Sequence, residues 1–358
     1  MTDGLERIVA GLVPGGKLLS VELLSPDQGT GTTGKAEGYG KPLRLRVRDA
    51  SGVERNLVFR TAAANEFGHD RRADRCEEML LAYDTFNGVP RHVRALDVGA
   101  ILPDGRLLSL REAGEMYLVT GWAEGTLYAE DLRRVARDSE SSPLDHARCE
   151  ALATYLAELH ATKLDDRVAW RRAVRDLVGH GEGIAGICDA YPADAPGAEP
   201  GRLRELERRC LEWRFLLRDR PERLSRTHGD FHPFNIVFGK GADFTLLDAS
   251  RGARGDPADD VAALAVNYVF FCAERRPSWP RGLGPLWHRF FDTYLERSGD
   301  RGMLEALPPF LAWRLLVVSC PRFYPGLGPA ARSSLLDLAE LALSSARFEP
   351  RLAGEVLS

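Results

Sequence analysis

The 358-residue sequence lacks most features that mark metal-binding, disulfide-stabilised or secreted proteins. Its six cysteines include no C-x-x-C pair, which excludes the common zinc and thiol redox spacings. Isolated cysteines in a chain of this length are interpreted as small buried hydrophobes in a reducing compartment. The first six residues are acidic and carry no apolar signal core, so we expect a cytoplasmic protein.

The sequence also lacks a membrane-length hydrophobic run and an excess of basic residues. Its most apolar stretch, residues 261–273, contains Asn267 and is shorter than the ~20 residues that span a bilayer. The chain has 48 Lys and Arg against 52 Asp and Glu, a net charge of −4, whereas nucleic-acid-binding domains are typically basic. We therefore expect no membrane and no nucleic-acid partner, while the oligomeric state is unknown from the sequence.

What the sequence does contain is an ordinary globular composition, with 44% hydrophobic and 28% charged residues. Short strand patterns separated by glycine fill its first third. Residues 17–24, 43–48 and 56–60 predict three strands, and residues 43–48 alternate apolar side chains with arginine, the period of a half-buried strand. A glycine-rich stretch, residues 27–42, separates the first two, so we expect an antiparallel sheet with a mobile flap.

A helix and two more strands are expected before the character of the chain changes. Residues 70–85 predict the helix, and residues 96–102 and 115–120 predict the strands. Residues 121–126, where glycines flank Trp122, are interpreted as a hinge.

From residue 127 onward apolar residues recur mainly at helical spacing. The sequence therefore predicts an α+β chain with a small β-rich N-terminal lobe, residues 1–120. A larger and mainly helical lobe, residues 127–358, follows the hinge.

The strongest chemical pattern is the segment THGDFHPFN, residues 227–235, followed by an apolar run that ends at Asp248. It places Asp230 on a loop and Asn235 five residues later. A short hairpin through residues 236–247 would bring Asp248 back beside Asn235. Phosphoryl transfer needs a carboxylate to orient the attacking hydroxyl and hard oxygen ligands to hold Mg²⁺ on the phosphates.

This segment resembles the catalytic core of the aminoglycoside phosphotransferase and choline kinase family, which shares the protein-kinase fold. Residues 156–160, which end at His160, resemble the L-x-x-L-H helix of that family, and residues 255–260 resemble a structural element after the metal site. The resemblance implies a bilobal protein-kinase-like fold. It also implies an enzyme that moves the γ-phosphate of ATP to a hydroxyl of a small molecule, with Mg²⁺ as its metal.

The resemblance assigns roles to the residues of the motif and to residues upstream. It implies that Asp230 is the catalytic base and that Asn235 and Asp248 bind magnesium. Arg60 stands where kinases carry a lysine on the third strand, and we expect it to contact the phosphates of ATP. Its partner on the following helix is expected to be Glu77. Glu78 is the alternative, because the helix register is uncertain.

Two further contacts with ATP follow from the hinge. Thr120 and Trp122 fit the segment that grips the adenine in the family, although packing is the alternative for Trp122. The loop Gly29–Lys35 matches most of a P-loop, but Ala36 follows where Ser or Thr would supply a hydroxyl to magnesium. We interpret it as a kinase-style flap over the phosphates, with a plain flexible hairpin as the alternative.

The histidines of the motif have a competing interpretation. His228 and His232 lie four residues apart, as zinc ligands often do, but a glycine separates them and a third ligand is lacking. We expect His228 to support the catalytic loop, and we leave open whether His232 lines the site. His160 is expected to be a core histidine with its hydrogen bonds satisfied.

Two other functions stay open at this stage. A protein kinase would carry D-F-G and A-P-E motifs, and Asp248 is followed instead by Ala249 and Ser250. A non-catalytic nucleotide-binding scaffold is favoured only by Arg60. The sequence does not identify the acceptor among aminoglycosides, sugars, amino alcohols, nucleosides and macrolides, nor does it separate ATP from GTP.

Overall fold

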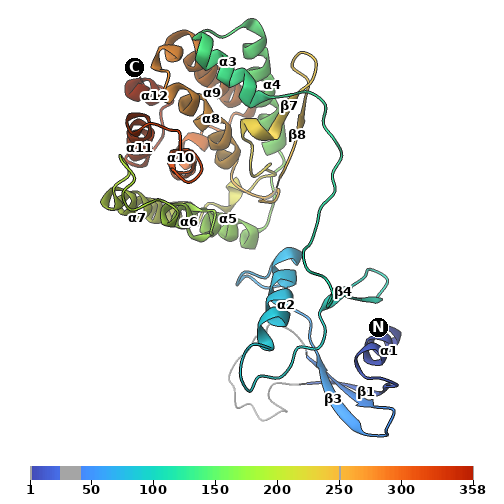
Figure 1. Ribbon diagram of the computed structural model, residues 1–358. Helices are drawn as coiled ribbons and strands as arrows, with labels where there is room; N and C mark the ends of the chain where they lie inside the picture. The colour runs from blue at the N-terminus through green and yellow to red at the C-terminus, as the bar shows by residue number, and fades with distance from the viewer. Residues whose placement is uncertain (1, 25–41, 250, 358) are drawn as a thin grey trace. The chain divides into compact units, whose positions relative to one another are not determined.

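The computed structural model describes residues 2–24, 42–249 and 251–357 of the chain (Figure 1). By its internal contacts the chain divides into two compact units, Met1–Thr120 and Gly121–Ser358. The division falls at the start of the segment where the sequence predicts a hinge. The predicted flap, Gly29–Lys35, lies outside the described residues.

A three-stranded antiparallel sheet and one helix form the core of the first unit. The strands β1 (Lys17–Leu23), β2 (Leu43–Arg48) and β3 (Glu54–Phe59) pair in the order β1-β2-β3. Their bounds confirm the three predicted strands to within two residues. The alternation in β2 buries Leu45 and Val47, while Arg46 and Arg48 are exposed.

Helix α1 (Thr2–Leu12) covers the apolar face of this sheet. Its Leu5 and Val9 are buried together with Leu45 and Val47 of β2, and these four side chains form the buried core of the unit. The charged face of the sheet stays in water, which is the expected arrangement for a one-sided antiparallel sheet.

The rest of the first unit is helix α2 (Arg72–Phe86) and a small hairpin of β4 (Gly99–Ile101) and β5 (Leu107–Ser109). The predicted helix at residues 70–85 is thereby confirmed. The strand predicted at residues 96–102 is reduced to the three residues of β4, and the strand predicted at residues 115–120 is wrong. Within the described part of the chain no strand pairs with residues 115–120, and an apolar pattern forms a strand only where a partner satisfies its backbone.

The second unit is mainly helical, with one small antiparallel sheet. The sheet consists of β6 (Thr126–Leu127), β7 (Ile236–Phe238) and β8 (Phe244–Leu246) in that order. The α-helices are α3 (Tyr128–Asp138), α4 (Pro143–His160), α5 (Arg167–Gly179), α6 (Ile184–Asp189), α7 (Pro200–Leu217), α8 (Pro257–Ala273), α9 (Gly284–Ser298), α10 (Met303–Ser319), α11 (Pro329–Leu343) and α12 (Leu352–Leu357). The predicted fold class, α+β with small strands first and mainly helices after, is confirmed.

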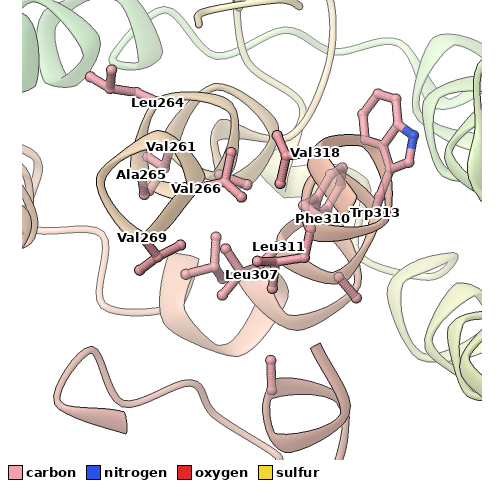
Figure 2. Packing of buried hydrophobic residues seen from close by; sticks show 14 of the residues in the cluster. Val261, Leu264, Ala265, Val266, Val269, Leu307, Phe310, Leu311, Trp313 and Val318 are labelled. Carbon is pink, nitrogen blue, oxygen red and sulfur yellow. The ribbon is translucent and has the colours of Figure 1, made fainter. Parts of the chain in front are cut away.

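Helices α8 and α10 form the centre of the large apolar core of this unit. Figure 2 shows Val266 and Val269 of α8 beside Leu307 and Leu311 of α10, all of them buried. The most apolar stretch of the sequence is therefore a buried core helix, as its length suggested. Each buried aliphatic side chain contributes about 1.5–3 kcal/mol, so this packing holds α8 and α10 firmly against each other.

Among the described residues, no helix is both long and apolar enough to cross a membrane. All six cysteines are free thiols, and Cys149, Cys210, Cys272 and Cys320 are buried. The interpretation as buried hydrophobes is wrong for Cys76, which is exposed, and Cys188 is half-buried. Burial raises the pKa of the Cys149 thiol to about 12, which makes it unreactive at neutral pH.

Candidate active site

The loop that contains Asp230 is shaped by a glycine. Gly229 has a φ of 84°, a left-handed conformation that favours glycine over any residue with a side chain. A Cβ at this position would lie 2.8 Å from the carbonyl oxygen of Gly252. The turn therefore depends on Gly229 both for its backbone angle and for space, and it sets the direction in which Asp230 leaves the chain.

The backbone before Asp230 is held by a buried carboxylate on α8. Asp260 accepts hydrogen bonds from the N–H groups of His228 (2.7 Å) and Gly229 (2.8 Å), and its Oδ2 lies 3.1 Å from Nε2 of His160. Burial disfavours the charged form of Asp260, but the bond with His160 and the two backbone N–H groups outweigh it and lower its pKa. His160 also contacts the Tyr294 hydroxyl at 2.9 Å, which confirms a buried histidine with both ring nitrogens satisfied.

The start of α8 is fixed by a second buried ion pair. Asp256 caps the helix by accepting from the N–H of Ala258 at 2.9 Å. The guanidinium of Arg223 donates to both oxygens of Asp256, at 2.6 and 2.7 Å, and reaches Asp300 at 3.2 Å. Since Asp260 lies one turn further along α8, this pair sets the position of the carboxylate that holds the loop.

Asp230 itself lies between two arginines and a histidine. Its Oδ1 accepts from Nη1 of Arg314 (2.8 Å) and Nη1 of Arg251 (3.0 Å), and its Oδ2 lies 3.4 Å from Nε2 of His232. Burial raises the pKa of Asp230, but the bond with His232 and the charges of Arg314 and Arg251 lower it far more. Asp230 is therefore an ionised carboxylate well below neutral pH.

The hydrogen bonds of the two histidines define their neutral tautomers. The Asp230 N–H donates to Nδ1 of His228 at 3.3 Å, so the ring carries its proton on Nε2 and donates it to the carbonyl of Leu247 at 2.8 Å. In the same way the Phe234 N–H donates to Nδ1 of His232 at 3.2 Å, which leaves the Nε2 proton of His232 facing Asp230. Both rings therefore form hydrogen bonds with the backbone of the loop. These contacts agree with the expectation that His228 supports the loop.

The hairpin of β7 and β8 brings Asn235 and Asp248 together. Ile236 pairs with Leu246, and the Leu247 N–H donates to the carbonyl of Asn235 at 2.8 Å. The side-chain amide of Asn235 donates through Nδ2 to the carbonyls of Asp230 (3.1 Å) and Asp248 (3.3 Å). The three residues singled out by the sequence are thus neighbours, linked through the backbone of each carboxylate residue; their chemical roles stay predictions.

The donor set around Asn235 fits a hard divalent cation. The amide of Asn235 uses its nitrogen for the loop and keeps its oxygen for a ligand, and the side chain of Asp248 is exposed. Amide and carboxylate oxygens are the ligands that Mg²⁺ prefers. Across the residues that the structure describes, no group of three or more His, Cys, Asp or Glu is arranged to hold a metal, so the zinc interpretation of His228 and His232 has no support.

The residues predicted to contact ATP lie apart from this loop in the sequence. Arg60 follows β3 and is exposed, and Glu77 is exposed on α2. Glu78 is half-buried, with Oε2 at 3.7 Å from Nε2 of His69. In the described part of the first unit Arg60 forms no ion pair with either glutamate, so that pairing stays a prediction.

The predicted hinge contacts lie on either side of the unit boundary. Thr120 is the last residue of the first unit, and Trp122 is the second residue of the next. The side chain of Trp122 is 86% exposed. Adenine contacts at Thr120 and Trp122 also stay predictions.

Sequence reasoning missed the two arginines that contact Asp230. A signal for Arg314 was available, because it is the one charged residue between Ala306 and Val318 in an otherwise apolar segment. A cation buried in such a helix requires an anion from elsewhere in the chain. Arg251 gave no comparable signal, since arginines are scattered through this sequence.

An ionised carboxylate, an amide and a second carboxylate on one loop and hairpin are the kinds of group that phosphoryl transfer needs. The family model described as "Phosphotransferase enzyme family" matches residues 52–298, more than half of the chain. The chain therefore belongs to the phosphotransferase enzyme family.

Solved structures of this kind are similar over the whole length but at low scores. A glucosamine kinase is 15% identical, with a TM-score of 0.43, and the match covers 94% of this chain and 97% of that one. An amicoumacin kinase in complex with AMP-PNP and Ca²⁺ is 13% identical, with a TM-score of 0.41 and coverages of 98% and 96%. The search of curated proteins gives no match. The family assignment rests on the family model.

Proposed function

We propose that this protein is an ATP-dependent small-molecule kinase, which transfers the γ-phosphoryl group to a hydroxyl of its acceptor. One observation carries the proposal. Asp230 is held ionised, and the hydrogen bonds of Asn235 and His228 connect its loop to the segment that contains Asp248. Membership of the phosphotransferase enzyme family supports the class of reaction.

The carboxylate of Asp230 orients the acceptor hydroxyl and receives its proton during transfer. The oxygen of the hydroxyl forms a bond to the γ-phosphorus, the bond from that phosphorus to the bridging oxygen breaks, and ADP leaves with the electron pair. Because the transition state of phosphoryl transfer is loose, the hydroxyl needs little activation and a weak base is sufficient. The lowered pKa of Asp230 is therefore compatible with the role, and its position contributes more than its basicity.

Asn235 and Asp248 would hold Mg²⁺, which supplies positive charge against the phosphate oxygens when it is bound. The contribution of the chain is to keep these two oxygen donors at a fixed place relative to Asp230. The Asn235 amide does this directly through its bonds to the carbonyls of Asp230 and Asp248. Replacing Asn235 would therefore disturb the loop as well as the donor set.

We further propose that Arg60, with Glu77 as its partner, contacts the phosphates of ATP and that Thr120 and Trp122 contact the adenine. Arginine in place of lysine keeps the charge but presents a planar fork of donors. We expect Arg60→Met to weaken ATP binding about tenfold or more in calorimetric titration, the loss of one charge-assisted contact. Arg55→Met, an exposed arginine of β3 that is paired with Asp49, is the matched control and should bind ATP normally.

The proposed reaction is tested by ADP release from Mg-ATP with a panel of hydroxyl acceptors. The panel contains aminoglycosides, sugars, amino alcohols, nucleosides and macrolides. Acceptor-dependent turnover is expected for at least one class, and Asp230→Asn should lower it by roughly 10²–10⁴-fold. Asp219→Asn, which changes an exposed aspartate after the end of α7, should leave it unchanged.

The outcomes separate the competing functions. ATP binding without turnover on any acceptor favours a non-catalytic scaffold. No binding of ATP contradicts the nucleotide assignment, and turnover that survives Asp230→Asn contradicts the assignment of the base.

A further inference from the structure

Arg314 is a buried cation in the middle of α10. Its side chain is 6% exposed, and its neighbours Leu311 and Leu315 belong to the apolar core. Removing a guanidinium from water is unfavourable unless anions are placed to receive its hydrogen bonds. Arg314 has two of them: Nη1 donates to Oδ1 of Asp230 at 2.8 Å, and Nη2 donates to Oδ1 of Asp259 at 2.6 Å.

The same guanidinium also touches the turn before Asp230. Its Nη2 lies 3.3 Å from the carbonyl of Gly229, and its carbon lies 4.1 Å from the centre of the Trp313 ring. Arg314 therefore connects three parts of the chain. It belongs to α10, it contacts the loop of Asp230, and it reaches the first turn of α8 through Asp259. An arginine with so many fixed contacts has a single orientation.

The two arginines around Asp230 use only one of its oxygens. Arg314 and Arg251 both donate to Oδ1, at 2.8 and 3.0 Å. Arg251 is itself held over the Trp313 ring, at 4.7 Å from the ring centre. The polar atom found beside Oδ2 among the described residues is Nε2 of His232, at the longer distance of 3.4 Å.

We propose that Arg314 is a positioning residue, which together with Arg251 fixes Oδ1 of Asp230 so that Oδ2 receives the proton of the acceptor hydroxyl. This inference rests on the kinase function proposed above. It deepens that function by naming the reacting oxygen and the side from which the acceptor approaches, the side of His232. Arg314 acts through Asp230 and has no contact with the substrate.

The charged and titratable groups around Asp230 define what removal of Arg314 does. Arg314 faces it from α10, Arg251 from the segment after β8, and His232 from its own loop. Tyr324, in the segment after α10, has a pKa raised by burial and by the charge of Asp230. Loss of Arg314 leaves Arg251 as the remaining arginine at Oδ1 of Asp230 among the described residues.

Two acidic groups lie behind the arginines. Asp259 has a pKa raised by its burial, against the attraction of Arg314, and the adjacent Asp260 adds to the increase. Glu182 lies 3.5 Å from Nε of Arg251 and is mostly exposed. Replacing Asp259 changes one acceptor of Arg314, while the bond from Arg314 to Asp230 can remain.

The matched variants are Arg314→Met and Arg332→Met. Arg332 on α11 is equally buried, but among the described residues it donates to the carbonyls of Ser319, Pro196 and Leu327 and to no carboxylate. Both changes should destabilise the second unit. Only Arg314→Met should lower kcat, by on the order of 100-fold from misplacement of the base, with the KM for ATP unchanged.

Two further variants keep the test decisive. If Arg314→Met fails to fold, Arg314→Lys, which supplies one cation without the fork, should fold and show a smaller change of the same kind. Asp259→Asn leaves the bond from Arg314 to Asp230 in place and should lower kcat less than Arg314→Met does. Unchanged kcat in the Arg314 variants, or an equal fall in Arg332→Met, would overturn the proposal.

A measurement that does not require enzyme turnover tests the role of Arg314 separately from the proposed kinase function. The carboxyl carbon of Asp230 is observed by NMR in protein labelled with ¹³C-aspartate, with Asp230→Asn for assignment. At neutral pH we expect its resonance to shift in Arg314→Met and to keep its position in Arg332→Met. Wild-type protein that turns over no acceptor but shows this change contradicts the kinase function alone. Turnover without this change contradicts the role of Arg314 alone.

Discussion

Ion pairs of nearly equal length have opposite surroundings in the two units. In the first unit Arg46 of β2 lies 2.8 Å from Glu54 of β3, with side chains 44% and 40% exposed. In the second unit Arg223 lies 2.6 Å from Asp256, with side chains 7% and 1% exposed. Water screens the first pair and is absent from the second. Burial, and not distance, decides what such a pair contributes.

Three sets of buried ion pairs in the second unit share a location. Arg223 with Asp256, His160 with Asp260, and Arg314 with Asp259 and Asp230 all border the catalytic loop or the start of α8. The pairs of Arg44 with Glu22 and of Arg46 and Arg48 with Glu54 in the first unit lie instead on the exposed face of its sheet. Buried pairs contribute little net stability, but they specify geometry, because breaking one leaves a charge without a partner.

The largest effect that sharpens this comparison is expected for Arg223→Met. The change leaves Asp256 buried without its bidentate partner, so the free energy of unfolding should fall by about 3–5 kcal/mol. Denaturation of both proteins in urea gives the difference. Arg220→Met is the matched control, since Arg220 pairs with Glu305 at 3.0 Å near the surface, and it should change the midpoint little. Equal losses in the two variants would show that burial does not separate the pairs.

The two apolar cores should respond to truncation in proportion to their size. Leu311→Ala removes a fully buried side chain between α8 and α10 (Figure 2), and about 2–5 kcal/mol of stability should be lost. Leu45→Ala should cost less, because the buried core of the first unit has only four side chains among the described residues and its neighbours can close part of the space.

Hydrogen exchange distinguishes the two truncations. We expect Leu45→Ala to reduce protection in β1, β2 and β3 while α8 and α10 keep theirs. Leu311→Ala should do the reverse. Loss of protection across the whole chain in both variants would contradict two separately packed cores.

A third change concerns the carboxylate that holds the loop. In Asp260→Asn the amide nitrogen cannot accept a hydrogen bond, so one of the N–H groups of His228 and Gly229 loses its acceptor, at a cost of about 1.5–3 kcal/mol. The variant should also show lower kcat, since Gly229 directs Asp230.

The pH dependence of this contribution has a definite sign. The pKa of Asp260 is lowered in the folded protein, so its stabilisation is complete above the ordinary aspartate pKa of about 3.9 and is lost as the pH falls through the lower folded value. Unfolding of the unchanged protein at a series of pH values below 5 should show this loss, and Asp260→Asn should lack it. Asp292→Asn, at an exposed position of α9, is the control. If the unfolding free energies of all three proteins depended on pH in the same way, Asp260 would not be the group responsible for this loss.

The smallest effect is expected for Arg46→Met in the first unit. The pair with Glu54 is exposed on the face of the sheet, and the unfolding midpoint should not move measurably. Arg48→Met, whose arginine contacts the same glutamate at 2.7 Å, provides a duplicate. A loss of stability as large as that expected for Arg223→Met would contradict the distinction between exposed and buried ion pairs.

Patterns local in the sequence predicted well. The alternation of residues 43–48 gave β2 with its bounds, and the spacing of Asp230, Asn235 and Asp248 gave the neighbours that the hairpin of β7 and β8 brings together. Both depend on residues a few positions apart, where backbone geometry fixes the outcome.

Contacts distant in the sequence were not predicted. Arg314 lies 84 residues from Asp230, and only the packing of α10 on α8 brings the two together. The strand expected at residues 115–120 failed for a related reason, because a strand needs a partner and the apolar pattern does not say whether one is present. The spacing of residues in the sequence indicated which groups lie together at the candidate site. The packing of the helices determines which side chains hold those groups in place.

The ring of His228 makes its position unusually hard to replace. One nitrogen accepts from the backbone of Asp230 and the opposite nitrogen donates to the carbonyl of Leu247, the residue before Asp248, so the rigid five-membered ring fixes the distance between these two segments. Among the twenty side chains only neutral histidine has an acceptor and a donor across such a ring. A redesign of this site must therefore keep His228 or rebuild the spacing between its two carboxylates by other means.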